Sequence, residues 1–350
     1  MKFKRGLLAA ELGVISPAIA DKSKISGLEC IWFDGKTAST YNTIIGIEKP
    51  IETDFTGGLP GKVLTGYLDR IQADEVDFAT KQTDLSISAG QSKLKLSLQD
   101  INNKLWKFPD FDKSNKLVLT KDLLTLLEHC SISINKNSSM QDPEFNGVTF
   151  ETTREDLNIY TTDVVSLSFA WIGRTKDYTL DRVTVPKEFI EQLLKICMAE
   201  DTLYLSPTSA VAINRSGTKL FGHILEVDNP RDFAGELDKS LPNNDKYIGL
   251  PAELESALDR AELLVSGSYD TVQLSLSGEV LHLYLNNPTL GELNDSIEVE
   301  DSGEGIIEAD FDPSFIKRAL KERTFLAMTP RCLVMTGPET FIHLVAARHT

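Results

Sequence analysis

The residue types that most often perform catalysis or hold metal ions are scattered along this chain. The histidines are His129, His223, His282, His343 and His349, and the cysteines are Cys30, Cys130, Cys197 and Cys332. Neither set shows the close spacing of a zinc, haem or redox site, and the chain has no phosphate-binding loop, nucleophile elbow or HExxH motif. We therefore expect a protein that is not an enzyme and that needs no metal or cofactor. Widely spaced cysteines are typical of proteins of the reducing cytoplasm.

An acidic, glycine-bearing segment, EVEDSGEGIIEAD (residues 298–310), is the next candidate for an ion site. It lacks the ligand spacing of an EF-hand loop, and we interpret it as the solvated loop of a β-hairpin. An enzyme with a site assembled from carboxylates far apart in the sequence stays open as an alternative.

Residues 312–323, DPSFIKRALKER, predict a basic helix in a chain of 350 residues with a formal net charge of −16. Asp312 followed by Pro313 is a typical helix start, with a capping side chain and then proline at the first helical position. At 100° per residue, the apolar side chains of this segment share one face. The opposite face carries Lys317, Arg318 and Lys321. A lone helix of this kind is usually a solvated surface helix, so the pattern gains meaning only if it recurs.

The element order helix, strands, helix, strands occurs three times in the chain. The opening helices are expected at 4–16, 119–133 and 250–266, and the second helices at 58–72, 185–198 and 312–323. Alternating, strand-like sequence follows each helix. Polar, proline-bearing linkers at 106–116 and 229–246 separate the copies. We therefore predict an α+β fold of three domains, 1–112, 113–236 and 237–350. Glu11 interrupts the apolar start of the chain, which we interpret as the first helix and not as an export signal.

The second helix of each copy carries basic residues opposite its apolar face. They are Lys62 and Arg70 in the first copy, Lys187 and Lys195 in the second, and Lys317, Arg318 and Lys321 in the third. Such helices, packed on sheets, predict a positive lining in a protein with an acidic exterior. This arrangement suits a protein that surrounds duplex DNA through phosphate contacts without reading its sequence. The chain contains no run of eighteen apolar residues, and we expect no membrane association.

Three stretches resemble the bacterial DNA polymerase III beta subunit, the sliding clamp family. They are FNGVTFETTREDLNIYTTD (145–163), VTVPKEFIEQLLKI (183–196) and RAELLVSGSYDTVQLSLSGEVLHLYLNNP (260–288). The resemblance covers nearly the whole chain. It implies three tandem clamp domains, each with two helices on antiparallel sheets, which assemble as a head-to-tail homodimeric ring. It also implies a cytoplasmic processivity factor that encircles duplex DNA, is opened by a clamp loader and tethers a DNA polymerase.

The resemblance also implies three sets of site residues. Further DNA contacts would come from Lys22, Lys24 and Lys136. The groove that takes short apolar peptides would include Phe145, Thr162, Leu167, Pro230, Tyr269, Asp312, Phe315, Leu333 and Val345. The dimer seam would include Leu96, Leu98, Leu263 and Leu264, for which a role in the hydrophobic core is the alternative.

The chain departs from the family at the proposed groove. The family commonly has Gly-His-Arg-Leu where this chain has Val164, Val165, Ser166 and Leu167, and its C-terminal Met-Pro-Met-Arg-Leu is replaced by residues 346–350. A differently shaped groove should prefer a different peptide. We therefore hypothesise a divergent clamp, encoded by a phage or mobile element. The main alternative is a repeated α+β assembly protein, such as a virion component.

Overall fold

The computed structural model describes residues 1–350 except 26, 82, 112, 135–141, 175–177, 244–245, 268–269, 304, 322, 338–339 and 349–350. The described chain divides into two compact units, each of which is built from two separate stretches. Unit 1 contains residues 1–124 and 175–225, and unit 2 contains residues 125–174 and 226–350. The three-domain division therefore stays a prediction, because these units cut the chain differently.

Within its described residues, unit 1 combines a four-stranded sheet, an eight-stranded sheet, three complete helices and the first turn of a fourth. The helices are α1 (Arg5–Ile15), α2 (Gly61–Arg70) and α4 (Lys187–Ile196). The first sheet has the order β1 (Lys2–Lys4), β6 (Glu75–Lys81), β7 (Asp84–Ala89) and β8 (Ser92–Ser97). The second has the order β5 (Gly57–Pro60), β2 (Cys30–Phe33), β3 (Thr37–Tyr41), β4 (Ile45–Pro50), β16 (Lys219–His223), β15 (Ser209–Ile213), β14 (Thr202–Leu205) and β9 (Lys116–Val118). Strand β13 (Arg182–Pro186) leads directly into α4.

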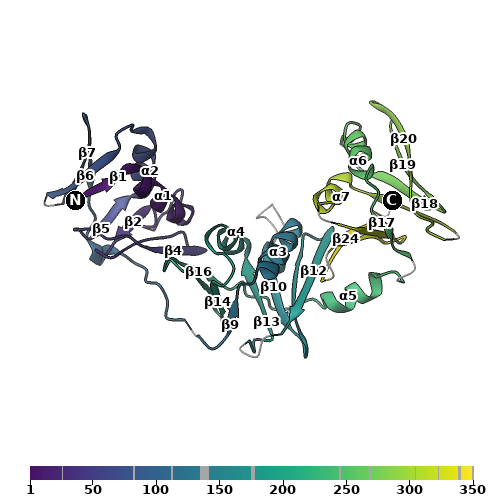
Figure 1. The fold of residues 1–350 in the computed structure, drawn as a ribbon, viewed down its shortest axis with the longest axis horizontal. Coiled ribbons are helices and arrows are strands. Elements are labelled where there is room, and N and C mark those ends of the chain that lie inside the picture. The colour runs from purple at the N-terminus through teal and green to yellow at the C-terminus, as the bar shows by residue number, and fades with distance from the viewer. Residues whose placement is uncertain are drawn as a thin grey trace. The chain divides into compact units, whose positions relative to one another are not determined.

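In unit 1, helices α1 and α2 lie side by side (Figure 1). Each places its apolar stripe inward, because residues three to four apart share one helix face. The buried residues are Leu8, Leu12 and Ile15 of α1 and Leu64 and Leu68 of α2. The eight-stranded sheet is joined where β4 pairs antiparallel with β16, with Gly46 opposite Phe221.

Unit 2 repeats this plan with different segments. Its helices are α5 (Phe233–Ser240), α6 (Leu254–Glu262) and α7 (Pro313–Ala319), together with most of α3 (Lys121–Cys130), and short helical turns follow at η3 (Ser131–Ser133) and η4 (Pro143–Asn146). The four-stranded sheet has the order β20 (Gly291–Glu298), β19 (Val280–Asn287), β18 (Val272–Ser277) and β21 (Ile306–Phe311). The longer sheet runs β10 (Gly147–Thr152), β11 (Asp156–Thr162), β12 (Ser166–Gly173), β24 (Phe341–Ala346), β23 (Cys332–Thr336), β22 (Phe325–Met328) and β17 (Ile248–Gly249).

The longer sheet of unit 2 is joined where β12 pairs antiparallel with β24, with Leu167 opposite Leu344. Its two faces belong to different cores. One face packs with α6 and α7, which lie side by side in Figure 1, and the other face packs with α5. Because side chains alternate along a strand, a shift of one residue moves a side chain from one core to the other.

The six predicted helices are present, and the prediction of a mixed α+β fold is confirmed. The acidic segment at 298–310 was predicted as a hairpin loop, and this was wrong. It connects β20 to β21, which are the two edge strands of the four-stranded sheet and do not pair with each other. Val299 N–H donates to the Glu279 carbonyl at 2.9 Å and Ser302 N–H to the Gly278 carbonyl at 2.9 Å. These bonds hold the segment against the turn between β18 and β19.

Within the described residues, no helix has the length and apolar character needed to cross a membrane. The same part of the chain contains no cluster of three or more His, Cys, Asp or Glu residues arranged to hold a metal ion.

Candidate functional site

A concave pocket of about 170 Å³ lies in unit 2 beside the paired strands β12 and β24. Leu167, Phe233 and Leu344 make its floor apolar, and all three belong to the core on the α5 face of the sheet. Two exposed charged residues, Glu236 and Arg331, stand among its lining residues. An apolar floor with a few polar groups around it is the usual anatomy of a site that holds apolar side chains of a ligand.

Helix α5 forms one wall of this pocket, in a segment that was predicted to be a linker. The side chain of Asp232 caps the helix by accepting a hydrogen bond from Gly235 N–H at 2.9 Å. Phe233 and Leu237, one turn apart, are buried against the sheet, and the Phe233 and Tyr160 rings lie 5.0 Å apart. The capping residue and the i, i+4 apolar pair were readable in the sequence, but the surrounding turn-forming residues concealed them.

The turn between β11 and β12, residues 162–166, forms the opposite wall. Thr162 Oγ1 donates to the Ser166 carbonyl at 2.8 Å and accepts from Val164 N–H at 3.2 Å. Asp163 Oδ1 accepts from Ser166 N–H at 2.8 Å and from Ser166 Oγ at 2.9 Å. Val164 has a φ of +79° and is 55% exposed. A β-branched residue in this left-handed region costs about 1–3 kcal/mol, and it persists only where its surroundings fix the backbone.

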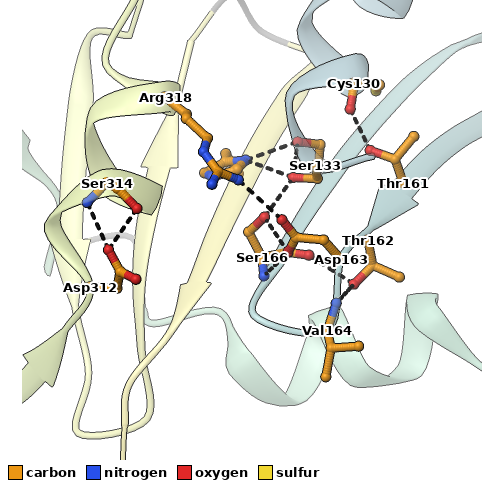
Figure 2. A network of polar contacts seen from close by, with 12 residues as sticks. Cys130, Ser133, Thr161, Thr162, Asp163, Val164, Ser166, Asp312, Ser314 and Arg318 are labelled. Carbon is orange, nitrogen blue, oxygen red and sulfur yellow. Dashed lines mark hydrogen bonds and ion pairs between the residues drawn. The ribbon is translucent and has the colours of Figure 1, made fainter. Parts of the chain in front are cut away.

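Asp163 also links this turn to α7. Arg318 Nη1 donates to Asp163 Oδ2 at 3.3 Å, although the two residues are 155 positions apart. Figure 2 shows the Arg318 side chain reaching from its helix to the Asp163 carboxylate, beside Ser166 and Ser133. The guanidinium carbon of Arg318 lies 4.2 Å from the centre of the Phe315 ring. The ring and the carboxylate together fix the direction of this side chain.

A chain of hydroxyl groups runs inward from the turn. It connects Ser166 to Ser133 at 3.0 Å, Ser133 to Ser168 at 2.8 Å and Ser168 to Nδ1 of His343 at 2.8 Å. Burial, together with the positive charges of Arg323 and Arg318, lowers the pKa of His343 to about 3. The imidazole is therefore neutral near pH 7 and takes part in the network as an uncharged group.

The structure brings only some of the predicted groove residues to the pocket. Thr162 and Leu167 line it. Leu333 and Val345 are fully buried on the other face of the sheet, in the core that packs against α6 and α7. Because successive side chains of a strand point to opposite faces, the pocket is lined instead by their neighbours Cys332, Leu344 and Ala346.

The other predicted groove residues do not line the pocket. Phe145 is buried in η4 beneath the guanidinium of Arg231, 4.6 Å from its ring centre. Pro230 is exposed in the segment before α5. Asp312 caps α7 by accepting from Ser314 N–H at 2.9 Å, as its sequence predicts. Phe315, on α7, is partly buried against the core that includes α6, and Tyr269 lies outside the described residues.

The predicted DNA-binding residues of unit 1 are mostly exposed. Exposed side chains are those of Lys22, Lys24, Lys62, Arg70 and Lys195, whereas Lys187 is half-buried. Lys62 forms an ion pair with Asp21, and Arg70 Nη1 donates to the Gly66 carbonyl at 2.7 Å. These contacts use one donor each and leave the groups at the surface.

The basic residues of α7 are less available than the sequence suggests. Lys317 Nζ lies 2.6 Å from a carboxylate oxygen of Asp259 and 2.6 Å from one of Glu262, both on α6. Hydrogen bonds to these two carboxylates raise the pKa of Lys317. Arg318 is engaged by Asp163, and Lys321 is exposed. Lys136 lies outside the described residues.

The predicted seam residues differ in exposure. Leu96, in the edge strand β8, is buried, and Leu98 is half-buried. Leu263, just after α6, is 77% exposed, whereas Leu264 packs on the core. Leu263 is therefore open to contact with a partner, whereas Leu96 belongs to the core.

A second pocket, of about 180 Å³, lies in unit 1 beside the joint of β4 and β16. Its walls are mostly aromatic. They include Tyr41, Trp106, Phe108, Phe221 and His223. Tyr41 Oη lies 3.1 Å from Nε2 of His223, so these two polar groups of the pocket already bind each other.

No protein-family model matches the chain. It is similar to the curated beta sliding clamp of Staphylococcus epidermidis, with 22% identity over 286 residues that cover 78% of this chain and 73% of the relative. It is also similar to the beta sliding clamp of Staphylococcus aureus, with 22% identity over 273 residues, 75% of this chain and 70% of the relative. These relatives lend no support to the alternative of a virion assembly protein.

Solved structures of the same kind match along the whole chain. The DNA polymerase beta subunit of Streptococcus pyogenes has a TM-score of 0.86 at 18% identity and covers 100% of this chain and 99% of its own. A putative DNA polymerase III beta subunit from Eubacterium rectale has a TM-score of 0.85 at 20% identity, with coverage of 100% and 99%. The low identities agree with a divergent sequence, whereas a phage origin stays a prediction. The chain has the fold of the bacterial DNA polymerase III beta subunits, the sliding clamps, as the sequence resemblance predicted.

Proposed function

We propose that this protein is a DNA sliding clamp, a processivity factor that encircles duplex DNA and tethers a polymerase through a peptide pocket. The observation that carries the proposal is the likeness in fold to DNA polymerase III beta subunits over the full length of the chain. The sequence similarity to curated beta sliding clamps supports it. In this proposal the protein performs no catalysis, and a clamp loader opens the ring.

Duplex DNA is contacted through phosphates in this proposal. The exposed lysines Lys22, Lys24, Lys195 and Lys321 are the main candidates, because their ammonium groups are open to solvent. Lys317 and Arg318 contribute less, since carboxylates of the chain already compensate their charges. Weak and exchangeable phosphate contacts suit a protein whose residence on DNA comes from ring closure.

The ring closes by pairing strand β8 of one copy with strand β20 of another. Both are edge strands of four-stranded sheets, and open edges are ready to add a strand. Strand β8 exposes Lys93 and Lys95, whereas β20 exposes Glu292 and Glu298, so the two edges carry opposite charge. The exposed Leu263 stands near β20, because Arg260 one turn earlier binds Asp295 of that strand at 2.8 Å.

A charge swap tests this seam. The double variant Lys93→Glu, Lys95→Glu should weaken the dimer in sedimentation experiments, and Glu292→Lys, Glu298→Lys on the other edge should weaken it as well. An equimolar mixture of the two variants should restore association, because each variant edge now faces its opposite. Two weakened variants that fail to rescue each other would contradict the pairing of β8 with β20.

The pocket beside β12 and β24 holds a short apolar peptide of the partner. Its apolar floor and polar rim fit this use. Val164 and Val165 replace the smaller and the polar residue common in the family, so the wall beside the floor is more apolar, and we infer a preference for compact aliphatic or aromatic side chains.

Imaging and DNA retention together test the whole proposal. Negative-stain images of the full chain should show closed rings with a central hole. After loading by the clamp loader of the same cell, the protein should stay on nicked circular DNA at high salt and leave when the DNA is cut, because topological binding does not depend on phosphate contacts. Compact particles without a hole, together with loss from circular DNA at high salt, would contradict a sliding clamp.

A further inference from the structure

The turn at residues 162–166 holds one of its pocket-lining residues, Val164, in a conformation that valine rarely adopts. Val164 has a φ of +79°, and its side chain is 55% exposed at the pocket. The left-handed region strains a β-branched residue, so the turn would relax if its hydrogen bonds were removed. The width of the pocket on this side therefore depends on whatever keeps the turn in place.

The side chains of Thr162 and Asp163 both hold the turn in place, and of these two only that of Asp163 links it to another element. Its carboxylate accepts from Ser166 N–H at 2.8 Å, from Ser166 Oγ at 2.9 Å and from Arg318 Nη1 at 3.3 Å. The Asp163 side chain is only 8% exposed, so an ionised carboxylate here needs these donors. Arg318 is the only one of the three donors that comes from another element and the only one that carries charge.

Arg318 reaches Asp163 because its own position is fixed. It lies on α7 with its guanidinium over the Phe315 ring, and Figure 2 shows its side chain directed at the turn and not outward from the helix. The sequence assigned Arg318 to DNA together with Lys321, which lies two residues after the end of α7 and is exposed. The two basic residues therefore have different environments.

We propose that Arg318 is a positioning residue for the peptide pocket. It acts through Asp163: the ion pair neutralises the buried carboxylate, the carboxylate holds Ser166, and the closed turn presents Val164 to the ligand. This inference rests on the proposed function in that the pocket binds an apolar peptide. It adds that a residue outside the pocket sets the shape of one wall, so that substitutions on α7 change peptide affinity without touching the peptide.

The test compares Arg318→Gln with Lys321→Ala in the full chain. The probe is a fluorescein-labelled synthetic pentapeptide ending in Leu-Phe, and its affinity is measured by fluorescence anisotropy. Arg318→Gln should lower the affinity about tenfold, as expected for coupled neighbours, and should speed amide hydrogen exchange at Val164 and Ser166. Lys321→Ala removes the same charge from the turn that follows this helix and should change neither measurement.

A double-mutant cycle separates positioning from a general loss of stability. Val164→Gly removes the strain, because glycine adopts positive φ freely, so Arg318→Gln in that background should cost less than about threefold in affinity. Asp163→Asn should reproduce Arg318→Gln, and the two together should not add. An equal loss of affinity with and without Val164→Gly would overturn the proposal.

The inference and the proposed function fail in different ways. Unchanged amide exchange in the turn of Arg318→Gln would overturn the positioning role, whatever the probe does. Failure of the unaltered protein to bind the probe, with the exchange effect present, would overturn the peptide site. If Arg318→Gln changed DNA retention and left peptide affinity constant, Arg318 would be a DNA-binding residue, which would contradict the inference.

Discussion

In each unit an antiparallel pair joins strands from distant segments of the chain, β4 with β16 in unit 1 and β12 with β24 in unit 2, and each of these joints has a pocket beside it. The pocket volumes, about 180 and 170 Å³, hardly differ, so size does not distinguish them. Their walls do. In unit 1 the connecting segment that lines the pocket, residues 106–109, contains no helix or strand and contributes aromatic rings. In unit 2 the connecting segment that lines the pocket forms the helix α5.

The aromatic rings make the unit 1 pocket a structural element. The ring centre of Trp106 lies 5.4 Å from that of Tyr41 and 6.4 Å from that of Phe108, and the ring centres of Phe108 and Phe221 lie 5.9 Å apart. Such tilted and edge contacts stabilise one arrangement of the rings. In unit 2 a helix and a hydrogen-bonded turn stand apart over an apolar floor and leave room for a ligand. The same joint thus serves packing in one unit and, in our proposal, recognition in the other.

The largest effect is expected from truncating one residue of each joint. Leu344→Ala in unit 2 and Phe221→Ala in unit 1 should each lower the free energy of unfolding by about 2–5 kcal/mol, because both side chains are buried. Only Leu344→Ala should also weaken the peptide probe, by at least about tenfold, since it removes part of the floor. Equal losses of probe affinity in the two variants would erase the functional difference between the pockets.

A pH titration compares the histidines of the two joints, His343 of β24 and His223 of β16. The pKa of His343 is lowered to about 3 in the folded chain, below about 6.5 in the unfolded chain. Below pH 6.5 the unfolded state therefore binds the proton more tightly, and stability falls as the pH drops toward 3. His343→Gln should remove up to about 1.4 kcal/mol per pH unit of this slope in denaturation experiments.

The exposed His223 serves as the control for this titration. If His223→Gln removes the slope and His343→Gln does not, His343 is not the residue that makes stability depend on pH.

The helix caps of the two connecting segments offer a smaller contrast. Asp232 caps the eight-residue α5, whereas Asp100 caps the three-residue helical turn at Ile101–Asn103. Asp232→Ala should lower the free energy of unfolding by about 1 kcal/mol and weaken the probe a few-fold, because α5 forms a pocket wall. Asp100→Ala should leave the probe affinity unchanged. Chemical denaturation and anisotropy measure both effects, and a larger loss of affinity from Asp100→Ala would contradict this assignment.

The smallest effects concern single lysines on the basic helices of the two units. Lys195→Ala on α4 should reduce the slope of log affinity for short duplex DNA against log salt by about 1, as for one phosphate contact. Lys317→Ala on α7 should reduce it by less, because Asp259 and Glu262 already bind this ammonium group. Fluorescence titrations at several salt concentrations give both slopes. A larger change for Lys317 would mean that DNA displaces its carboxylate partners.

Elements with strong periodicity were predictable from the sequence, and contacts between distant elements were not. The six helices and the cap at Asp312 follow from local patterns. The partners of Lys317 and Arg318 lie on other elements. The sequence therefore predicts a basic polar face for this helix, whereas in the fold carboxylates compensate the charges of these two residues. The segment 229–246 contains many turn-forming residues, yet it forms the short helix α5 at Phe233–Ser240.

The pocket residues show a second limit, which is strand register. Leu333 and Val345 were assigned to the groove by resemblance, yet a difference of one position places each on the other face of its sheet. At about 20% identity a strand of five or six residues offers few anchors for an alignment, and any shift of one residue reverses inside and outside.

The late pairing of the joint strands sets a time scale for biosynthesis. Glu48 of β4 binds Lys219 of β16 at 2.8 Å across 171 positions, and Ser168 of β12 meets His343 of β24 across 175. At translation rates of about 5–20 residues per second, each partner strand leaves the ribosome roughly 10 to 35 s after the first. During that interval the edges of β4 and β12 stay unpaired on the nascent chain and open to chaperones and to premature association.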